Sequence, residues 1–158
     1  MKNIHGKKIT ILGAVRSGLG AAKLAKRLQA IPFVSDMQKE EKLSEAKDIL
    51  VSEGIEFEFG LHSEKVFDCD ILITSPGVPT ESNVIQGAIK RNKYIISEIE
   101  FSSWFCKSPI IAITGTNGKT TTTLLIKSVF DKVGIKSGLI GTVKNMVDDR
   151  EYPSSLTT

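Results

Sequence analysis

The sequence predicts an α/β protein in which a parallel sheet is covered by helices on both faces. Two features support this fold class. Short apolar runs alternate with amphipathic stretches of helical length, and glycine-containing turns follow several of the runs. Strands that alternate with helices in this way pair in parallel, because each helix crosses a face of the sheet to reach the next strand.

The first 97 residues contain this alternation. Apolar runs predict strands, and apolar residues at helical spacing predict helices. The expected strands cover 8–12, 31–35, 55–59, 70–74 and 94–97. The expected helices cover 18–30, 38–53 and 81–92. We therefore predict a Rossmann-like parallel sheet domain over residues 1–97.

The pattern changes near residue 98. Residues 98–106 predict a short amphipathic helix, and we expect residues 98–108 to form a linker helix between two domains. Its aromatic side chains are expected to pack at the junction; they are Phe101, Trp104 and Phe105. Glu98 and Glu100 lie at the helix start, where carboxylates meet the helix dipole favourably. A role of these two carboxylates in a substrate cleft stays open.

A second unit is expected over residues 109–158. Its expected elements are a strand over 110–114, a helix over 119–133 and a strand over 137–141. No long element is expected after Thr142. We therefore predict the beginning of a second α/β domain.

The composition is that of an ordinary soluble protein. The chain has 158 residues, 41% apolar and 25% charged, with 21 Lys and Arg against 18 Asp and Glu. The two charge signs are interleaved, so no nucleic-acid partner is expected. No apolar run approaches the roughly 20 residues that span a bilayer, and no signal peptide is visible, so we expect a cytoplasmic protein without a membrane partner. Cys69 and Cys106 are expected to be free, mostly buried thiols, and His5 and His62 to lie at the surface.

A glycine loop precedes the expected helix of the second unit, with the sequence Thr114-Gly115-Thr116-Asn117-Gly118-Lys119-Thr120-Thr121. Its glycines let backbone N–H groups turn toward one point, Lys119 adds a positive charge, and the Thr120 hydroxyl can ligate Mg²⁺. Ile113 replaces the first glycine of the usual motif, so this is a variant P-loop. The alternative is a glycine turn that only caps a helix.

A second glycine turn, Gly13-Ala14-Val15-Arg16-Ser17-Gly18, follows the first expected strand. Val15 replaces the central glycine of the dinucleotide fingerprint, which argues against NAD. Arg16 and Ser17 offer a cation and a hydroxyl to a diphosphate, and Asp36 could accept a hydrogen bond from a ribose hydroxyl or a base N–H. The alternative is a tight turn with a capping Asp and no ligand.

A proline-containing loop, Ser75-Pro76-Gly77-Val78-Pro79, follows the expected strand over 70–74. It lies at the carboxyl edge of the expected sheet, where open α/β sheets bind ligands. The alternative is a rigid turn without a ligand.

Together these motifs resemble the amino-terminal part of the Mur ligases, ATP-dependent amide-forming enzymes of peptidoglycan precursor synthesis. The first domain looks like the UDP-binding domain of the D-glutamate-adding branch, and the second like the start of the family's P-loop ATPase domain. The resemblance rests on residues 13–18, Asp36, 75–79, 96–101 and 114–121. Residues 138–143 and 155–158 look more like the diamino-acid-adding branch, so the identity of the added amino acid stays open.

The resemblance implies a reaction, its ligands and the residues that serve it. ATP would phosphorylate the alanine carboxylate of UDP-N-acetylmuramoyl-L-alanine, and the amine of D-glutamate would displace phosphate. Lys119 and Thr120 would be catalytic, Lys119 by stabilising the transferring phosphoryl group and Thr120 by holding Mg²⁺. The ATP loop would comprise Gly115, Thr116, Asn117, Gly118, Lys119, Thr120 and Thr121. The uridine diphosphate would contact Arg16, Ser17, Asp36, Ser75, Pro76 and Gly77.

The resemblance also implies features that lie beyond these motifs. Thr157 and Thr158 would contact the UDP-sugar, and the full-length enzyme would be a monomer. The family needs a further Mg²⁺ carboxylate, a modified lysine, a histidine and a third domain, so we expect these 158 residues to be inactive alone.

Two other functions stay open. One is a stand-alone UDP-sugar-binding module, which a natural stop codon after Thr158 would favour. The other is a different ATP-dependent amide ligase of the folylpolyglutamate or cyanophycin type, against which Thr120-Thr121 and the UDP-type first domain argue.

Overall fold

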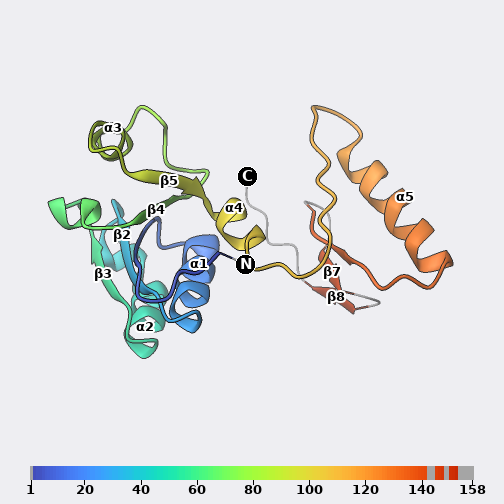
Figure 1. Ribbon diagram of the computed structural model, residues 1–158, viewed down its shortest axis with the longest axis horizontal. Helices are drawn as coiled ribbons and strands as arrows, with labels where there is room; N and C mark the ends of the chain where they lie inside the picture. Colours follow the sequence, from blue (N-terminus) through green and yellow to red (C-terminus); the bar gives the residue numbers. More distant parts are fainter. Residues whose placement is uncertain (1, 142–144, 148–149, 153–158) are drawn as a thin grey trace. The chain divides into compact units, whose positions relative to one another are not determined.

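A computed structural model of the chain describes residues 2–141, 145–147 and 150–152 (Figure 1). The chain divides into two compact units, Met1–Ser108 and Pro109–Thr158. Among the described residues, no helix is long and apolar enough to cross a membrane.

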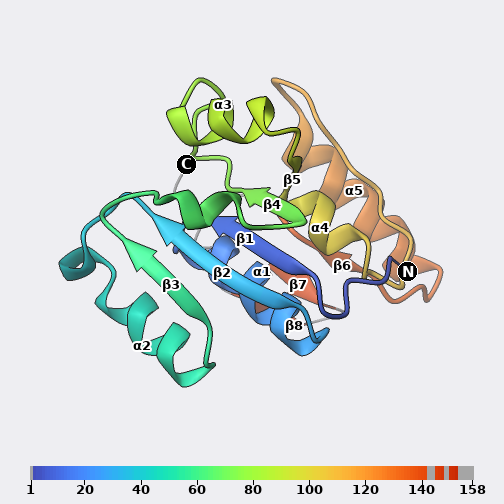
Figure 2. The same cartoon turned by 60° about the vertical axis from the view of Figure 1, so that its left-hand side comes forward.

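The first unit contains a five-stranded parallel sheet with the order β3-β2-β1-β4-β5 (Figure 2). The strands are β1 (Lys8–Leu12), β2 (Ile31–Asp36), β3 (Glu56–Phe59), β4 (Ile71–Thr74) and β5 (Tyr94–Ser97). The α-helices are α1 (Arg16–Arg27), α2 (Ser44–Ser52), α3 (Asn83–Lys90) and α4 (Glu98–Ser103). The short 3-10 helices are η1 (Glu40–Lys42) and η2 (Glu64–Phe67). The predicted Rossmann-like parallel sheet is confirmed.

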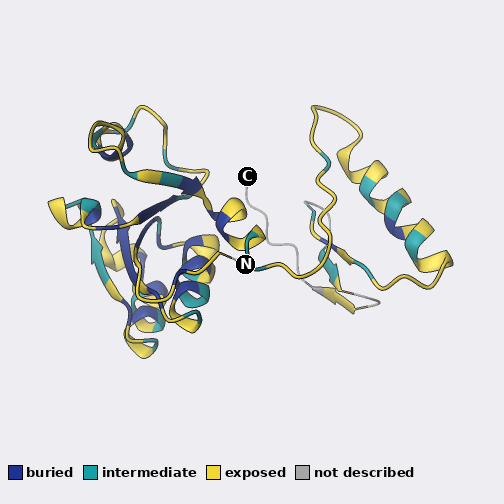
Figure 3. Ribbon diagram, viewed as in Figure 1, coloured by how far each residue is buried: buried dark blue, intermediate teal, exposed yellow. Residues whose placement is uncertain are grey.

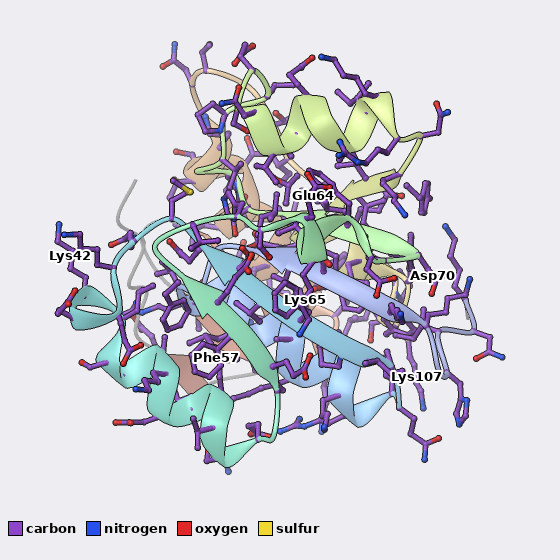
Figure 4. All side chains as sticks on the ribbon, turned by 90° about the vertical axis from the view of Figure 1, so that its left-hand side faces the viewer. Lys42, Phe57, Glu64, Lys65, Asp70 and Lys107 are labelled. Carbon is purple, nitrogen blue, oxygen red and sulfur yellow. The ribbon has the colours of Figure 1, made fainter. Side chains whose placement is uncertain are left out.

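Alternate side chains of the strands enter two separate hydrophobic clusters. Ile9 and Ile11 pack with residues of α1, α2 and α4 in one cluster, whereas Leu12 and Leu72 pack with residues of α3 and η2 in the other. Because side chains alternate between the faces of a sheet, the helices cover both faces. On one of them, Lys65 of η2 lies over β2, with Nζ 4.8 Å from the ring centre of Phe33 (Figure 4).

The strand order reverses between β1 and β4. The chain leaves β1 for β2 and β3 on one side, and β4 then pairs with the opposite edge of β1. This is the topological switch point of the sheet, and open α/β sheets bind ligands at the carboxyl ends of the strands that flank it. A ligand site is therefore expected at the loops after β1 and β4.

The expected helix over 38–53 is interrupted. Residues Glu40–Lys42 form η1, and α2 begins only at Ser44. Leu43 lies between them with φ −120°, and its side chain is 6% exposed within the core. The break therefore lets Leu43 enter the core.

The helix α4 belongs to the first unit, so the interpretation of residues 98–108 as a linker helix is wrong. Phe101 is fully buried in the cluster that contains Ile9 and Ile11, and Trp104 and Phe105 pack against the same cluster. Burial of these aromatic groups attaches the helix to the sheet.

The second unit contains α5 (Lys119–Lys132) and a short antiparallel sheet. The strands are β6 (Gly138–Leu139), β7 (Asn145–Val147) and β8 (Arg150–Tyr152), in the order β6-β7-β8. Most of α5 is exposed (Figure 3). The strand predicted over 137–141 is thus reduced to the two residues of β6.

The strand predicted over 110–114 is wrong. Residues 110–114 have no strand conformation, and Ile110 and Ile111 are 59% and 58% exposed. A strand needs a neighbour that pairs with its backbone N–H and C=O groups. None of the strands within the described ranges pairs with this segment.

The two cysteines differ in burial. Cys69 is buried, as expected, whereas Cys106 is exposed, so the prediction for Cys106 is wrong. Cys106 follows α4, where the aromatic residues occupy the core-facing positions.

Candidate functional site

The glycine turn after β1 is tightly closed. Gly13 has φ +104°, a conformation that favours glycine, and its N–H donates to the carbonyl oxygen of Ser35 at 2.9 Å. A Cβ added to Gly18 in α1 would overlap the carbonyl oxygen of Gly13. Glycine at both positions therefore lets α1 start directly against the end of β1.

Asp36, at the end of β2, holds this turn in place. Its Oδ2 accepts from the Ala14 N–H at 2.7 Å and its Oδ1 from the Gln38 N–H at 2.8 Å. The side chain is buried. A carboxylate oxygen can accept more than one hydrogen bond, so a ligand contact would use the remaining lone pairs. The structure gives Asp36 a positioning role beside its predicted role in binding.

Ser75 joins the loop after β4 to the same turn. Its N–H donates to the carbonyl oxygen of Leu12 at 3.3 Å, and a Cβ on Gly13 would lie 2.8 Å from Ser75 Oγ. The hydroxyl of Ser75 donates to Oε1 of Glu98, which is 5% exposed. The loops after β1 and β4 and the first residue of α4 thus meet at the switch point.

The role of Glu98 was left open by the sequence pattern, which identified only a carboxylate at a helix start. The signal that could have identified this role is the position of Glu98 directly after β5, at the carboxyl edge of the sheet.

Pro76 and Gly77, which also belong to the predicted UDP site, are exposed in the loop after β4.

We expect Glu98→Ala to lower the free energy of unfolding by about 1–3 kcal/mol, because the Ser75 hydroxyl loses its acceptor and a buried side chain is removed. Glu98→Gln keeps an acceptor oxygen and should lower the free energy of unfolding by less than half as much as Glu98→Ala. Urea unfolding followed by the fluorescence of Trp104, the single tryptophan, measures both. Glu100→Ala, which removes an exposed carboxylate of the same helix, is the control. Equal stability of all three variants would contradict this role.

The other residues of the predicted UDP site lie at the start of α1. Arg16 and Ser17 are exposed in its first turn, and Val15 at the N-cap provides no side-chain hydrogen bond. The first N–H groups of a helix have no intrahelical acceptor, and the helix dipole favours an anion there. The structure therefore brings the start of α1, Asp36 and Ser75 to one edge of the first sheet.

A second polar cluster lies at the ends of β2 and β3. Ser35 Oγ lies 2.8 Å from Glu58 Oε1 and 2.6 Å from His62 Nδ1. Glu58 also accepts from the N–H and the hydroxyl of Ser63, at 2.9 and 2.5 Å. His62 is half-buried and lies among polar side chains. Burial lowers the pKa of His62, while the nearby charges of Glu58 and Asp36 act in the opposite direction.

The glycine loop of the second unit has the conformation that its glycines allow. Gly115 and Gly118 have φ +144° and +77°, and Gly118 is the N-cap of α5. Residues 114–121 are all exposed. Lys119 Nζ donates to the carbonyl oxygen of Gly115 and, at 3.4 Å, to that of Thr116, so the ammonium group lies over the loop.

The chemistry of this loop suits an Mg²⁺ ion that arrives with phosphate. Among the described residues, no group of three or more His, Cys, Asp and Glu side chains could hold a metal. Mg²⁺ is commonly held by one or two protein ligands together with phosphate oxygens and water. The exposed hydroxyl of Thr120, at the start of α5, fits that limited contribution.

Two family models match the chain. The MurD N-terminal domain matches residues 8–84, and the Mur ligase middle domain matches residues 113–158. Thr157 and Thr158, and most of the stretch compared above with the diamino-acid-adding branch, lie outside the described residues.

Curated relatives agree with these matches. The chain is 47% identical, over 87% of its length, to a UDP-N-acetylmuramoylalanine--D-glutamate ligase of Chloroherpeton thalassium. It is 45% identical, over 80% of its length, to a protein of the same name from Salinibacter ruber. It spans 29% and 27% of the lengths of these two relatives, less than a third of each.

Solved structures show the same fold at lower sequence identity. A murein peptide ligase from Psychrobacter arcticus superposes with a TM-score of 0.56 at 22% identity, covering 95% of this chain and 35% of that one. A UDP-N-acetylmuramate-alanine ligase from Thermotoga maritima has a TM-score of 0.51 at 24% identity, covering 85% of this chain and 31% of that one. With its Rossmann-like first unit and with both matched domains drawn from one group of enzymes, the chain belongs to the Mur ligase family.

Proposed function

We propose that the chain is the amino-terminal part of a cytoplasmic, ATP-dependent ligase that joins D-glutamate to UDP-N-acetylmuramoyl-L-alanine. The observation that carries this proposal is a closed glycine turn at the switch point of the first sheet, followed in the same chain by a phosphate loop with Lys119 and Thr120. The names of the curated relatives support the same reaction.

In this proposal the first unit binds the uridine diphosphate part of the substrate. The start of α1 would receive the diphosphate, with Arg16 supplying a positive charge and Ser17 a hydroxyl. Ser75, Pro76 and Gly77 would border the ligand. Asp36 would hold the glycine turn in place by accepting the hydrogen bond from the Ala14 N–H, and it would offer its remaining lone pairs to the nucleoside.

The second unit would bind ATP. Lys119 would leave the carbonyl groups of Gly115 and Thr116 and turn to the phosphates, where its charge stabilises the transferring phosphoryl group. Gly115 and Gly118 would shape the loop, and the N–H groups at the start of α5 would bind phosphate oxygens, with Thr116, Asn117 and Thr121 lining it. Thr120 would hold Mg²⁺, which neutralises phosphate charge when bound.

The proposed chemistry is acyl activation followed by amide formation. The alanine carboxylate takes the γ-phosphoryl group and ADP leaves; the amine of D-glutamate then attacks the acyl carbon, and phosphate leaves. We expect the 158-residue chain to bind ligands with little or no turnover, because it spans less than a third of the length of the curated relatives.

Calorimetric titration of the 158-residue chain tests the proposal. We expect saturable binding of UDP-N-acetylmuramoyl-L-alanine and, in a separate titration, of ATP with Mg²⁺. NADH is the matched negative ligand, because Val15 occupies the position at which a dinucleotide site needs glycine. Binding of NADH together with failure of both other ligands would overturn the assignment.

A further inference from the structure

Asn117 and Gly118 form the single Asn-Gly pair of the sequence, in the middle of the phosphate loop. Glycine has no Cβ, so its backbone nitrogen stays open to the side chain that precedes it. The other asparagines are all followed by residues that carry a side chain; they are Asn3, Asn83, Asn92 and Asn145. The pair is therefore the place where an asparagine of this chain can most easily react with the backbone.

Both reacting groups of this pair are accessible. Asn117 and Gly118 are exposed, as is the whole loop before α5 (Figure 3). Among the described residues, no group accepts the Gly118 N–H, and the side-chain amide of Asn117 makes no hydrogen bond. Neither the nucleophilic nitrogen nor the amide carbon is thus held back by a partner.

Positive charge surrounds the pair. Gly118 is the N-cap of α5, and the start of a helix carries a partial positive charge. The Lys119 ammonium lies over the same loop, at the carbonyl oxygens of Gly115 and Thr116. This charge favours loss of the Gly118 N–H proton, and it also favours a negatively charged product.

The start of α5 has N–H groups that can receive such a product. The first intrahelical hydrogen bond runs from the Thr122 N–H to the carbonyl oxygen of Gly118, at 3.0 Å. The N–H groups of residues 119–121 come before it and have no intrahelical acceptor. A carboxylate at position 117 would therefore lie beside the groups that the proposed function assigns to phosphate.

We propose that Asn117 is a site of spontaneous deamidation that inactivates the phosphate loop when no nucleotide is bound. The Gly118 nitrogen loses its proton to solvent and attacks Cγ of Asn117. The new C–N bond closes a succinimide ring, and the side-chain NH2 group takes up a proton and leaves as ammonia. Water then opens the ring at either carbonyl group, which gives isoaspartate or aspartate.

The product would compete with ATP in two ways. Its carboxylate is an anion beside Lys119 and the start of α5, where it repels phosphate and takes up the same donors. Isoaspartate also inserts a carbon atom into the backbone before Gly118, so the N–H groups of the loop no longer turn toward one point. The inference rests on the proposed binding of ATP by the second unit.

Tryptic peptide mapping of the 158-residue chain measures the modification directly. Cleavage after Lys107 and Lys119 gives the peptide 108–119, in which Asn117 is the single side-chain amide. During incubation without nucleotide, this peptide should deamidate at least about tenfold faster than the peptide 3–7, because the exposed Asn3 is followed by the β-branched Ile4. Labelling with an isoaspartyl methyltransferase identifies the isoaspartate product.

Calorimetry on the same samples connects the modification to ATP. The number of ATP-binding sites should fall in step with the deamidated fraction of peptide 108–119. ATP with Mg²⁺ present at about ten times its Kd should slow the deamidation by about tenfold, because the nucleotide-free fraction falls by that factor. NADH at the same concentration should give no protection.

Three variants test the roles of the charge and of the ring closure. Asn117→Asp copies one product and should bind ATP at least about tenfold more weakly than the fresh chain. Asn3→Asp, the matched control, adds the same charge to the first unit and should leave the ATP affinity unchanged. Asn117→Gln would have to close a larger and slower-forming ring, so it should keep its own starting number of ATP-binding sites throughout the incubation.

The outcomes separate this inference from the proposed function. Deamidation of peptide 108–119 no faster than that of peptide 3–7 would overturn the inference alone. Full ATP binding by the deamidated chain or by Asn117→Asp, or an equal deamidation rate with and without ATP in a chain that binds ATP, would also overturn it alone. Failure of the fresh chain to bind ATP would overturn the proposed function, and the inference with it.

Discussion

Gly18→Ala is expected to destabilise the first unit by about 3 kcal/mol or more, at the upper end of the cost of inserting a methyl group into a packed site. The added Cβ would overlap the carbonyl oxygen of Gly13, a backbone atom that cannot rotate away. The start of α1 would have to move off the end of β1. Thermal unfolding followed by Trp104 fluorescence should show a Tm lower by roughly 12 °C or more.

Gly20→Ala is the matched control for this change. Gly20 lies in the same helix, and a Cβ added there would meet nothing within 4 Å. Alanine has the higher helix propensity, so this variant should gain up to about 1 kcal/mol. The proposed UDP site adds a second readout, since Gly18→Ala should also weaken UDP binding. Equal Tm values for the two variants would show that the turn is not closed as described.

Lys119→Ala is expected to weaken ATP binding by about 10- to 100-fold, the usual effect of losing a charged hydrogen-bond donor to an anion. The Lys119 ammonium lies over the loop between Gly115 and Gly118, from which it can reach a bound phosphate. Isothermal titration with ATP and Mg²⁺ measures the change. UDP binding by the first unit should stay the same.

Lys132→Ala removes an exposed lysine from the other end of α5 and serves as the control. It makes the same change in net charge as Lys119→Ala, so any general electrostatic effect appears in both variants. An equal loss in the two would mean that Lys119 acts only through net charge, and an unchanged affinity in Lys119→Ala would remove the loop as the phosphate site.

Elements that depend mainly on their own residues were predicted well from the sequence pattern. The bounds of β1 and β5 coincide with the apolar runs that predict them, and α5 begins at Lys119 as expected. The strand over 110–114 failed because strand structure depends on a pairing partner elsewhere in the fold. The role of α4 also depended on its surroundings, since an aromatic helix after β5 can join either of two domains until its packing is known.

The alternation of strands and helices, the two glycine turns and the family could be predicted from the chain alone, because they depend on residue types at short spacings. Which polar groups meet depends instead on the folded arrangement. Ser75 and Glu98 are 23 residues apart, and Ser35 and His62 are 27 apart. Each pair forms because the strand order places the ends of neighbouring strands together, and a linear pattern of apolar residues does not specify that order.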